Sequence, residues 1–375
     1  MDLNTIRAEI DEIDEQLLRL FEKRTALACD VAKYKKENNM AVFQKDREQF
    51  ILDKAAGAVA DEMKNGVRLL FTTLMDISKC RQQQLLTDPR PFVSHAPKKE
   101  RPIAATVTRG SYSAEACNLF FNGNCDIRYV RNFEEVFSAV ERGEVDYGVL
   151  PIENSTAGDV SATYDLMGKH RFYISKTVKV HISHILAAKK GADPSRIKTV
   201  YSHEMALRQC ASFLDRFSAD TIPMSSTAEA AKYVSYAEEP CAAICSAPCA
   251  RLYGLEPLAE DISDVRDNFT RFILISNRLE IPENASVVSL SLTLPHTPGS
   301  LYRLLTRFAF CGLNLSRIES KPVPPDLAEL KDDAFDFIFY LDFIGNIRSP
   351  EVIKLLNNLE DEMKYYRFLG NYAEE

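Results

Sequence analysis

A run of short hydrogen-bonding side chains, Glu153 to Thr156, follows an apolar segment near the middle of this chain of 375 residues. The apolar segment, Tyr147 to Ile152, has the composition of a buried strand, and Gly158 closes the run. Serine, threonine and asparagine at a strand end, beside a helix start, place short polar groups where unpaired backbone N–H groups gather. Such an arrangement can hold a small polar anion. Taken alone, the run is more simply explained as a polar turn with a helix cap, so other segments must decide.

Two later segments, Tyr201 to Cys210 and Asn268 to Phe272, decide in favour of chemistry. Together with the first run and in this order, they resemble prephenate dehydratase. The resemblance extends from about Ile103 to Ile275 and includes Gly110-Ser-Tyr-Ser113. It implies two α/β lobes with a cleft between them, similar to periplasmic binding proteins.

The reaction that this resemblance implies removes CO₂ and water from prephenate, and the leaving hydroxyl needs a hydrogen-bond donor. The resemblance assigns that role to Thr270. It assigns substrate binding to Asn154, Ser155, Ser202, Gln209, Arg271 and Phe272. The chain departs from the family pattern at Glu204-Met205, where proline and glutamine are usual, and this could alter the shape of the cleft.

Charged and amide side chains stand out in the first 86 residues, where most charges would simply be solvated. Arg24 and Lys35 are eleven residues apart and lie on nearly the same helix face, about 16 Å along the axis. Arg7 lies about 25 Å from Arg24 by the same count. One small ligand cannot span that distance, so if both arginines serve one site, they come from different copies of the chain.

This segment resembles the all-helical type of chorismate mutase, from about residue 4 to residue 86. By that resemblance, cations hold the two carboxylates of chorismate, Lys35 and Gln82 meet the breaking ether oxygen, and Glu48 accepts the ring hydroxyl. Substrate binding is assigned to Arg7, Arg24, Arg47, Glu48 and Ser78. Gln44 stands where the family often has aspartate. A site for a pericyclic rearrangement holds the substrate in a compact conformer and stabilises the charge that develops on the ether oxygen. It requires neither a nucleophile nor a metal.

The C-terminal segment carries Pro298-Gly-Ser-Leu-Tyr302 and Glu319-Ser-Lys-Pro322, which resemble the two signatures of ACT regulatory domains. The resemblance implies that phenylalanine binds there as an effector. The residues concerned are Gly299, Ser300, Leu301, Glu319 and Ser320. Lys321 stands where arginine is usual. Lysine keeps the positive charge but lacks the paired N–H donors with which a guanidinium binds a carboxylate.

Periodicity gives the elements that must position these residues. Apolar residues at helical spacing predict one helix over about residues 4–36, a second after Gln44 and a third over about 62–86. Short strands and helices alternate from 103 to 275, which predicts a mostly parallel α/β fold. The last segment predicts a ferredoxin-like βαββαβ order. We therefore expect an all-α domain at 1–88, a two-lobed α/β domain at 101–278 and an ACT domain at 285–375.

Composition limits the remaining possibilities. The chain is 46% hydrophobic with a net charge of −8, which argues against nucleic acid as a partner. No apolar run approaches the roughly 18–20 residues of a membrane span. No signal peptide is evident, and we expect a cytoplasmic protein with its nine cysteines reduced. Cys241, Cys245 and Cys249 have the spacing of one helix face, where packing explains them better than a metal does.

The three resemblances together indicate a bifunctional chorismate mutase–prephenate dehydratase of phenylalanine biosynthesis, inhibited by phenylalanine. They imply no cofactor and a homodimer or larger assembly. Two alternatives remain open: an arogenate dehydratase, and a non-catalytic amino-acid sensor on the same fold.

Overall fold

The computed structural model describes residues 2–38, 45–97, 100–325, 327 and 336–374. The chain divides into two compact units. One contains residues 1–92, 290–320 and 332–367, and the other contains residues 93–289, 321–331 and 368–375.

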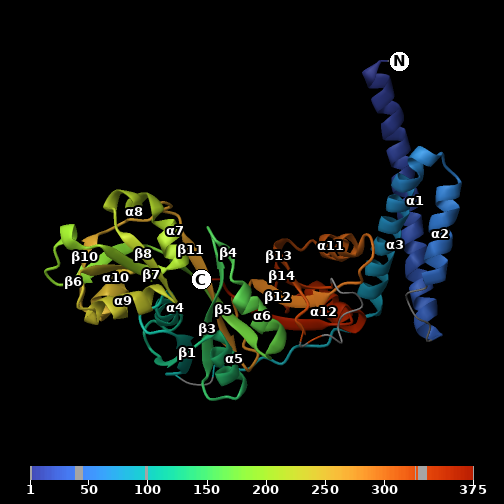
Figure 1. Cartoon of the computed structure of the whole chain (residues 1–375). Coiled ribbons are helices and arrows are strands. Elements are labelled where there is room, and N and C mark those ends of the chain that lie inside the picture. The colour runs from blue at the N-terminus through green and yellow to red at the C-terminus, as the bar shows by residue number, and fades with distance from the viewer. Residues whose placement is uncertain (1, 39–44, 98–99, 326, 328–335, 375) are drawn as a thin grey trace. The chain divides into compact units, whose positions relative to one another are not determined.

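The N-terminal segment is helical, as predicted. It consists of α1 (Leu3–Glu37), α2 (Lys45–Gly57), a short 3-10 turn η1 (Asp61–Met63) and α3 (Lys64–Leu86). The side chain of Asp2 caps α1 by accepting from the backbone N–H groups of Asn4 and Thr5. α3 packs against α1 and α2, while the first turns of α1 extend past both (Figure 1). Many of the apolar side chains of α1 are therefore exposed.

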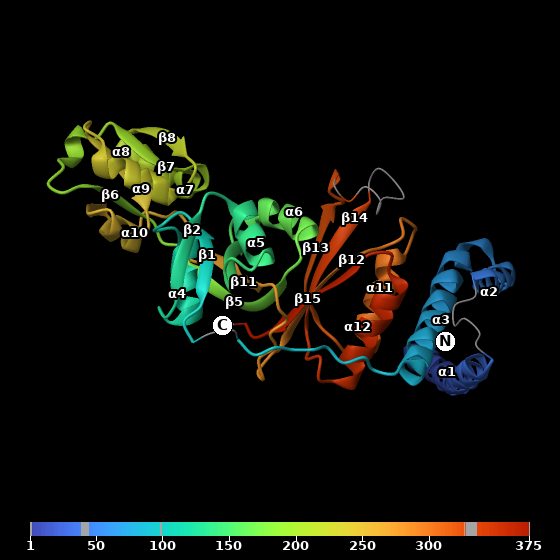
Figure 2. The ribbon, with the colours of Figure 1, turned by 90° about the horizontal axis from the view of Figure 1, so that it is seen from below.

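The C-terminal segment has the predicted order of strands and helices. Its elements are β12 (Val287–Thr293), α11 (Ser300–Phe310), β13 (Leu315–Pro322), β14 (Phe337–Ile344), α12 (Pro350–Glu362) and β15 (Tyr366–Tyr372). The sheet order is β13-β14-β12-β15, so β13 is an edge strand. α11 and α12 lie on the same face of this sheet (Figure 2), and both pack against α3.

The α/β region has two lobes, each built on its own sheet. In the first lobe the sheet order is β2-β1-β3-β11-β5, with the short β4 paired to β3. Its strands are β1 (Ile103–Val107), β2 (Asp126–Val130), β3 (Tyr147–Asn154), β4 (Gly158–Asp159), β5 (Tyr173–His181) and β11 (Phe269–Ser276). Its helices are α4 (Tyr112–Phe121), α5 (Phe133–Glu141) and α6 (Ser161–Lys169).

In the second lobe the sheet order is β10-β6-β9-β7-β8. Its strands are β6 (Ile185–Lys189), β7 (Thr199–His203), β8 (Asp220–Met224), β9 (Cys241–Cys245) and β10 (Leu255–Ala259). Its helical elements are η2 (Pro194–Arg196), α7 (Glu204–Gln209), α8 (Ala211–Phe217), α9 (Thr227–Tyr236) and α10 (Ala247–Leu252). The core combines large aliphatic side chains with many alanines and cysteines.

Both sheets are mixed, so the prediction of mostly parallel sheets is wrong. β11 is antiparallel to β3 and to β5, and β6 is antiparallel to β9 and to β10. The reason is topological. The chain leaves the first lobe after β5, and β11 returns only after the second lobe is complete, running between β3 and β5 in the opposite direction.

The predicted helix face of cysteines is also wrong. Cys241 and Cys245 begin and end strand β9, and Cys249 lies in α10, which starts at Ala247 with Pro248 in its first turn. Four-residue spacing therefore spans two elements here. Within the described parts of the chain, no helix has the length and apolarity to cross a membrane.

Candidate active sites

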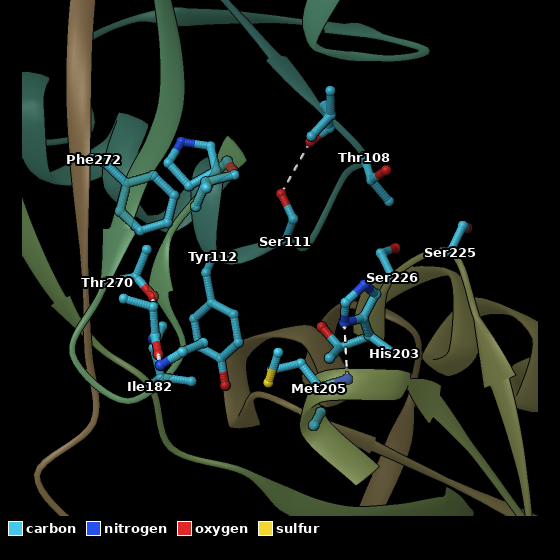
Figure 3. A pocket seen from close by; sticks show the side chains of 18 of the residues that line it. Thr108, Ser111, Tyr112, Ile182, His203, Met205, Ser225, Ser226, Thr270 and Phe272 are labelled. Carbon is cyan, nitrogen blue, oxygen red and sulfur yellow. Dashed lines mark hydrogen bonds between the residues drawn. The ribbon is translucent and has the colours of Figure 1, made fainter. Parts of the chain in front are cut away.

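A cavity of about 610 Å³ is lined by both lobes of the α/β region. Thr270, Phe272 and Ile182 lie on one side of it, and His203, Ser225 and Ser226 lie opposite (Figure 3). Its polar lining comprises Thr108, Ser111, Tyr112, Ser113, Arg131, Asn132, Asn154, Asp159, His184, His203, Gln209, Ser225, Ser226, Thr227 and Thr270.

Thr270 meets Asn154 on this wall because β3 and β11 pair with these two residues opposite each other. Asn154 Nδ2 is 2.9 Å from Thr270 Oγ1 and 2.8 Å from Asn268 Oδ1. Asn154 Oδ1 accepts from the backbone N–H groups of Thr156, at 3.1 Å, and Ala157, at 2.9 Å. Two residues that the sequence assigned to the reaction are thus joined directly.

Gln209 reaches the same wall from the end of α7 in the other lobe. Its Nε2 is 2.9 Å from Thr156 Oγ1, and its Oε1 is 3.1 Å from His184 Nε2. His184 follows the crossover from β5 to β6, and its Nδ1 is 3.2 Å from the hydroxyl of Tyr112. Burial lowers the pKa of His184, and the contact with Gln209 opposes that shift in part.

Three helices, α4, α5 and α9, begin at the cavity wall. Their first residues follow Ser111, Asn132 and Ser226, whose side chains accept backbone N–H groups of the first turn. The remaining N–H groups of each first turn and the helix dipole favour bound anions. Arg131 adds a cation beside Asn132, ion-paired with Glu135. The cavity therefore offers anion-binding positions in both lobes.

Three residues predicted to bind substrate lie outside the cavity lining. The hydroxyl of Ser155 is hydrogen-bonded to backbone groups of the segment around β11. Ser202 is fully buried and donates to the carbonyl of Ile244. Arg271 lies 3.1 Å from Glu153, because alternation along a strand turns it to the opposite face from its two neighbours.

The predicted anion site directly after the polar run is also not formed. The backbone N–H groups of Thr156 and Ala157 donate to the side chain of Asn154, so they are already used. The chain then enters β4, and the next helix begins only at Ser161. This run holds Asn154 in place, and the helix N-termini described above face the cavity instead.

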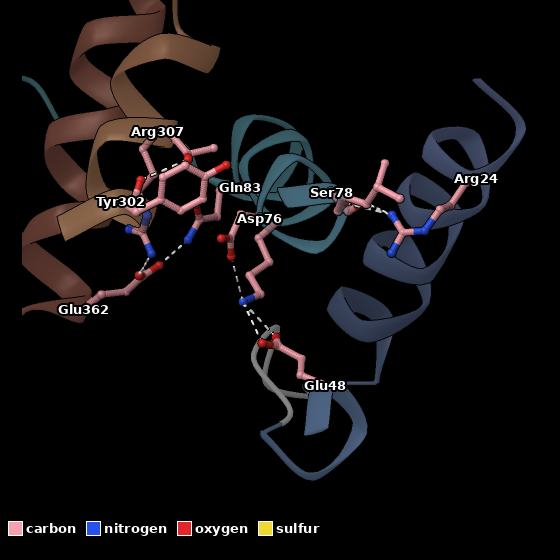
Figure 4. Close-up of polar contacts among 11 residues, drawn as sticks. Arg24, Glu48, Asp76, Ser78, Gln83, Tyr302, Arg307 and Glu362 are labelled. Carbon is pink, nitrogen blue, oxygen red and sulfur yellow. Dashed lines mark hydrogen bonds and ion pairs between the residues drawn. The ribbon is translucent and has the colours of Figure 1, made fainter. Parts of the chain in front are cut away.

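In the N-terminal helices, Arg24 connects α1 to α3. Its Nη1 donates to the carbonyl of Leu74, at 2.8 Å, and to Ser78 Oγ, at 2.5 Å (Figure 4). Gln82, one helical turn after Ser78, is buried, as is Lys35. Burial lowers the pKa of Lys35, and the charge of Glu48 opposes that shift.

Glu48 of α2 is held by a lysine that the sequence reasoning missed. Lys79 Nζ lies 2.8 Å from Glu48 and 3.3 Å from Asp76, and Figure 4 shows this cluster between α2 and α3. Arg47 lies with its guanidinium carbon 5.4 Å from the ring centre of Phe50. Arg24, Lys35, Glu48 and Gln82 are thus carried by three helices that pack together.

Arg7 is not part of this group. It lies near the start of α1, on exposed turns, and it makes no hydrogen bond or ion pair with the rest of the described chain. Gln44, where the family often has aspartate, lies outside the described residues.

The predicted effector residues lie at the start of α11 and on the edge strand β13. Gly299 has φ of +83° and precedes α11, a backbone conformation that glycine adopts without strain. Ser300 Oγ is 2.8 Å from the hydroxyl of Thr297, and Leu301 is 37% exposed. Glu319 and Ser320 lie on β13.

Lys321, next along β13, is ion-paired with Asp159, which lines the cavity described above. Its ammonium also lies 5.4 Å from the ring centre of Tyr164. The pair lowers the pKa of Asp159, chiefly through the hydrogen bond from Lys321.

Sequence reasoning missed four residues that complete the cavity network. They are Tyr112, Thr156, His184 and Asn268. Three of them stand inside or beside segments that had been singled out, so the signal was present. His184 follows His181 and Ser183 in a segment that no motif marked, and the crossover between the lobes brings it to Gln209.

Two family models match the chain, chorismate mutase type II over residues 6–83 and prephenate dehydratase over residues 103–280. A bifunctional chorismate mutase/prephenate dehydratase from Aquifex aeolicus (strain VF5) is 31% identical over 376 residues, which cover 99% of this chain and 98% of the relative. Arogenate dehydratase 2 of Petunia hybrida is 35% identical over 283 residues, which cover 73% of this chain and 72% of the relative.

Among solved structures, the prephenate dehydratase from Arthrobacter aurescens in complex with L-Phe is 33% identical, with a TM-score of 0.66. The similar region covers 72% of this chain and 89% of the Arthrobacter aurescens chain. The similarity to the Aquifex aeolicus relative runs through both matched segments and nearly the full length of each protein. The two resemblances to chorismate mutase and prephenate dehydratase are confirmed, and the chain belongs to the family of bifunctional chorismate mutase/prephenate dehydratases.

Proposed function

We propose that the chain rearranges chorismate to prephenate at its N-terminal helices and converts prephenate to phenylpyruvate, CO₂ and water in the cavity of its α/β region. These are two steps of phenylalanine biosynthesis. The observation that carries the proposal is the direct contact between Asn154 and Thr270 on the wall of a cavity large enough for a small dicarboxylate.

In the dehydratase, Thr270 faces the leaving hydroxyl. Because it accepts a hydrogen bond from Asn154, its own proton is directed elsewhere and can be donated to the departing oxygen. A threonine hydroxyl has a high pKa, so it donates a hydrogen bond or relays a proton rather than acting as a free acid. Buried Phe272 and Ile182 line the cavity and give apolar surface for the ring of prephenate.

The two carboxylates of prephenate bind at the helix N-termini that line the cavity. α4 and α5 belong to the first lobe and α9 to the second, so a dicarboxylate can bridge the lobes. Arg131 adds a positive charge on the first side. Arg271 is not assigned to the substrate, because it is paired with Glu153 outside the cavity lining. Met205 lines the cavity and contributes to its shape.

In the mutase, cations bind the carboxylates of chorismate while Lys35 and Gln82 donate to the ether oxygen. Arg24 is positioned by Ser78, and Glu48 is positioned by Lys79. Burial of Lys35 strengthens its interaction with charge that develops on the ether oxygen. Arg47 serves the same substrate from α2. Arg7 serves it from a second copy of the chain, since it lies about 25 Å from Arg24 along one helix.

The C-terminal segment is proposed to be an ACT domain that binds phenylalanine and inhibits the dehydratase. Its strand order and the L-Phe complex of the Arthrobacter aurescens relative support this assignment. The helix start at Gly299 and the edge strand with Glu319 and Ser320 offer groups for a carboxylate and an ammonium. We keep the boundaries 1–88, 101–278 and 285–375 for the three domains.

Arogenate dehydration is a second candidate, and the 35% identity to the Petunia hybrida enzyme favours testing it. Arogenate differs from prephenate by an amino group on the side chain. A non-catalytic sensor is less well supported, because the Asn154, Gln209 and Thr270 arrangement is intact. The deciding experiment incubates the purified chain separately with chorismate, prephenate and arogenate. Phenylpyruvate is detected from the first two substrates and phenylalanine from arogenate, because arogenate keeps its amino group.

Phenylpyruvate from both chorismate and prephenate is the expected result. If only arogenate gave product, arogenate and not prephenate would be the substrate. No product from any of the three substrates would leave only the sensor function.

A further inference from the structure

Each hydrogen bond around Thr270 allows only one choice of donor and acceptor, and the orientation of the Asn154 amide fixes that choice. Asn154 Oδ1 faces two backbone N–H groups, of Thr156 and Ala157, which can only donate. Its amide orientation is therefore fixed, and its Nδ2 must donate to Thr270 Oγ1 and Asn268 Oδ1.

The direction continues through Thr156 to the opposite lobe. Thr156 Oγ1 is 2.8 Å from Asn154 Oδ1, and two oxygens at this distance repel unless the hydroxyl donates. The single proton of Thr156 is thus used, and the group of Gln209 that meets Thr156 must be its NH₂. Gln209 Oε1 consequently faces His184 and can only accept.

His184 must therefore carry its proton on Nε2, 3.1 Å from Gln209 Oε1. The side chain is 1% exposed, so bulk solvent does not replace this donor. Tyr112 supports the ring from the other side, with its hydroxyl 3.2 Å from Nδ1 and 2.6 Å from the carbonyl of Ser183. Burial raises the pKa of Tyr112 well above its usual value, so the hydroxyl keeps its single proton, which it donates to the carbonyl of Ser183.

We propose that His184 is a positioning residue of the dehydratase, whose Nε2–H starts a directed chain through Gln209, Thr156 and Asn154 to Thr270. The proposal rests on the proposed function of this cavity and deepens it. The chain leaves two protons for the substrate, the hydroxyl proton of Thr270 and the second amide proton of Gln209. Without the donor at His184, the amide of Gln209 rotates, Thr156 loses its donor and both protons lose their fixed direction.

Three substitutions at this position separate positioning from packing. His184→Gln keeps an N–H donor near the place of Nε2, His184→Asn carries the same amide on a shorter side chain, and His184→Leu has no donor. We expect His184→Leu and His184→Asn to lower kcat for prephenate by about 10- to 100-fold with KM nearly unchanged. His184→Gln should recover to within about fivefold of the parent. Circular dichroism and thermal unfolding of each variant, compared with the parent, report that the α/β region is folded.

Equal activity of all three variants and the parent would overturn the proposal, as would equal loss in all three. A second measurement uses the parent protein alone, with ¹⁵N-labelled histidine. The account predicts a protonated Nε2 at His184, and a proton on Nδ1 only would contradict it. Failure of the proposed function would look different, because the parent itself would then not dehydrate prephenate.

Discussion

Polar side chains are held in place differently in the dehydratase cavity and in the mutase helices. In the cavity, each polar group of the network is held by another group of the same chain, from Thr270 through Asn154 and Gln209 to His184. In the helices, Arg24 and Glu48 are held in this way, but Arg7 stands apart on exposed turns.

Apolar exposure marks the same difference. Along α1, Ile10 is 50% exposed, Leu17 54% and Leu20 63%, whereas Phe272 and Ile182 of the cavity are buried. A row of exposed isoleucine and leucine on a long helix is typical of a surface that packs against another chain. The comparison teaches that the hydrogen-bond network of the dehydratase cavity closes within one chain, whereas Arg7 stands apart from the other mutase residues, which is why we propose that two copies share the mutase site.

The largest effect is expected from removing Thr270, the proposed proton donor of the cavity. Thr270→Ala should reduce prephenate dehydration by roughly 10²–10⁴-fold, since the leaving hydroxyl loses its donor. Chorismate mutase turnover should stay at the parent level, because the mutase residues lie on other elements. Steady-state assays of both reactions on one preparation measure the two effects together.

Thr177→Ala is the matched control. Thr177 is a buried threonine of the neighbouring strand β5 and lies outside the cavity lining. It should leave kcat for prephenate close to that of the parent. Parent-level dehydration by Thr270→Ala would show that this residue has no part in the chemistry.

A smaller effect is expected at the effector site. Gly299→Val places a branched side chain at the start of α11, where the proposed ligand carboxylate binds. The phenylalanine concentration for half-inhibition should rise by roughly tenfold or more, with uninhibited turnover retained. Calorimetry with phenylalanine measures binding directly.

Gly312→Val serves as the control for backbone strain. Gly312 also has positive φ, at the other end of α11, and neither glycine has other atoms within 4 Å of an added Cβ. The two variants should be strained alike, and only the first should lose phenylalanine. If Gly299→Val binds phenylalanine as tightly as the parent, the effector site lies elsewhere.

Much of this architecture could be predicted from local sequence. Helical periodicity identified α1 and α3, and the last six elements appeared in the predicted order, because each depends on neighbours within about 15 residues. The sheets were predicted less well. The antiparallel insertion of β11 depends on a return after more than 80 residues in the other lobe, which no local pattern encodes.

The sites divide in the same way. Asn154 and Thr270 could be recognised by motif, and strand pairing places them together. Arg271 belongs to the same motif, yet strand alternation turns it away from the cavity. His184 and Lys79 act through contacts between elements distant in sequence, so their residue types alone did not mark them.

Mixing two inactive variants tests the difference between the two sites most directly. An Arg7→Ala chain and an Arg24→Ala chain should each lack mutase activity and keep full dehydratase activity. After subunit exchange in equal amounts, about a quarter of the mutase sites should regain both arginines if the assembly is a dimer. The account predicts that this recovered mutase activity appears while dehydratase activity stays constant. If subunit exchange is verified and no mutase activity returns, the account is contradicted and the whole mutase site lies within one chain.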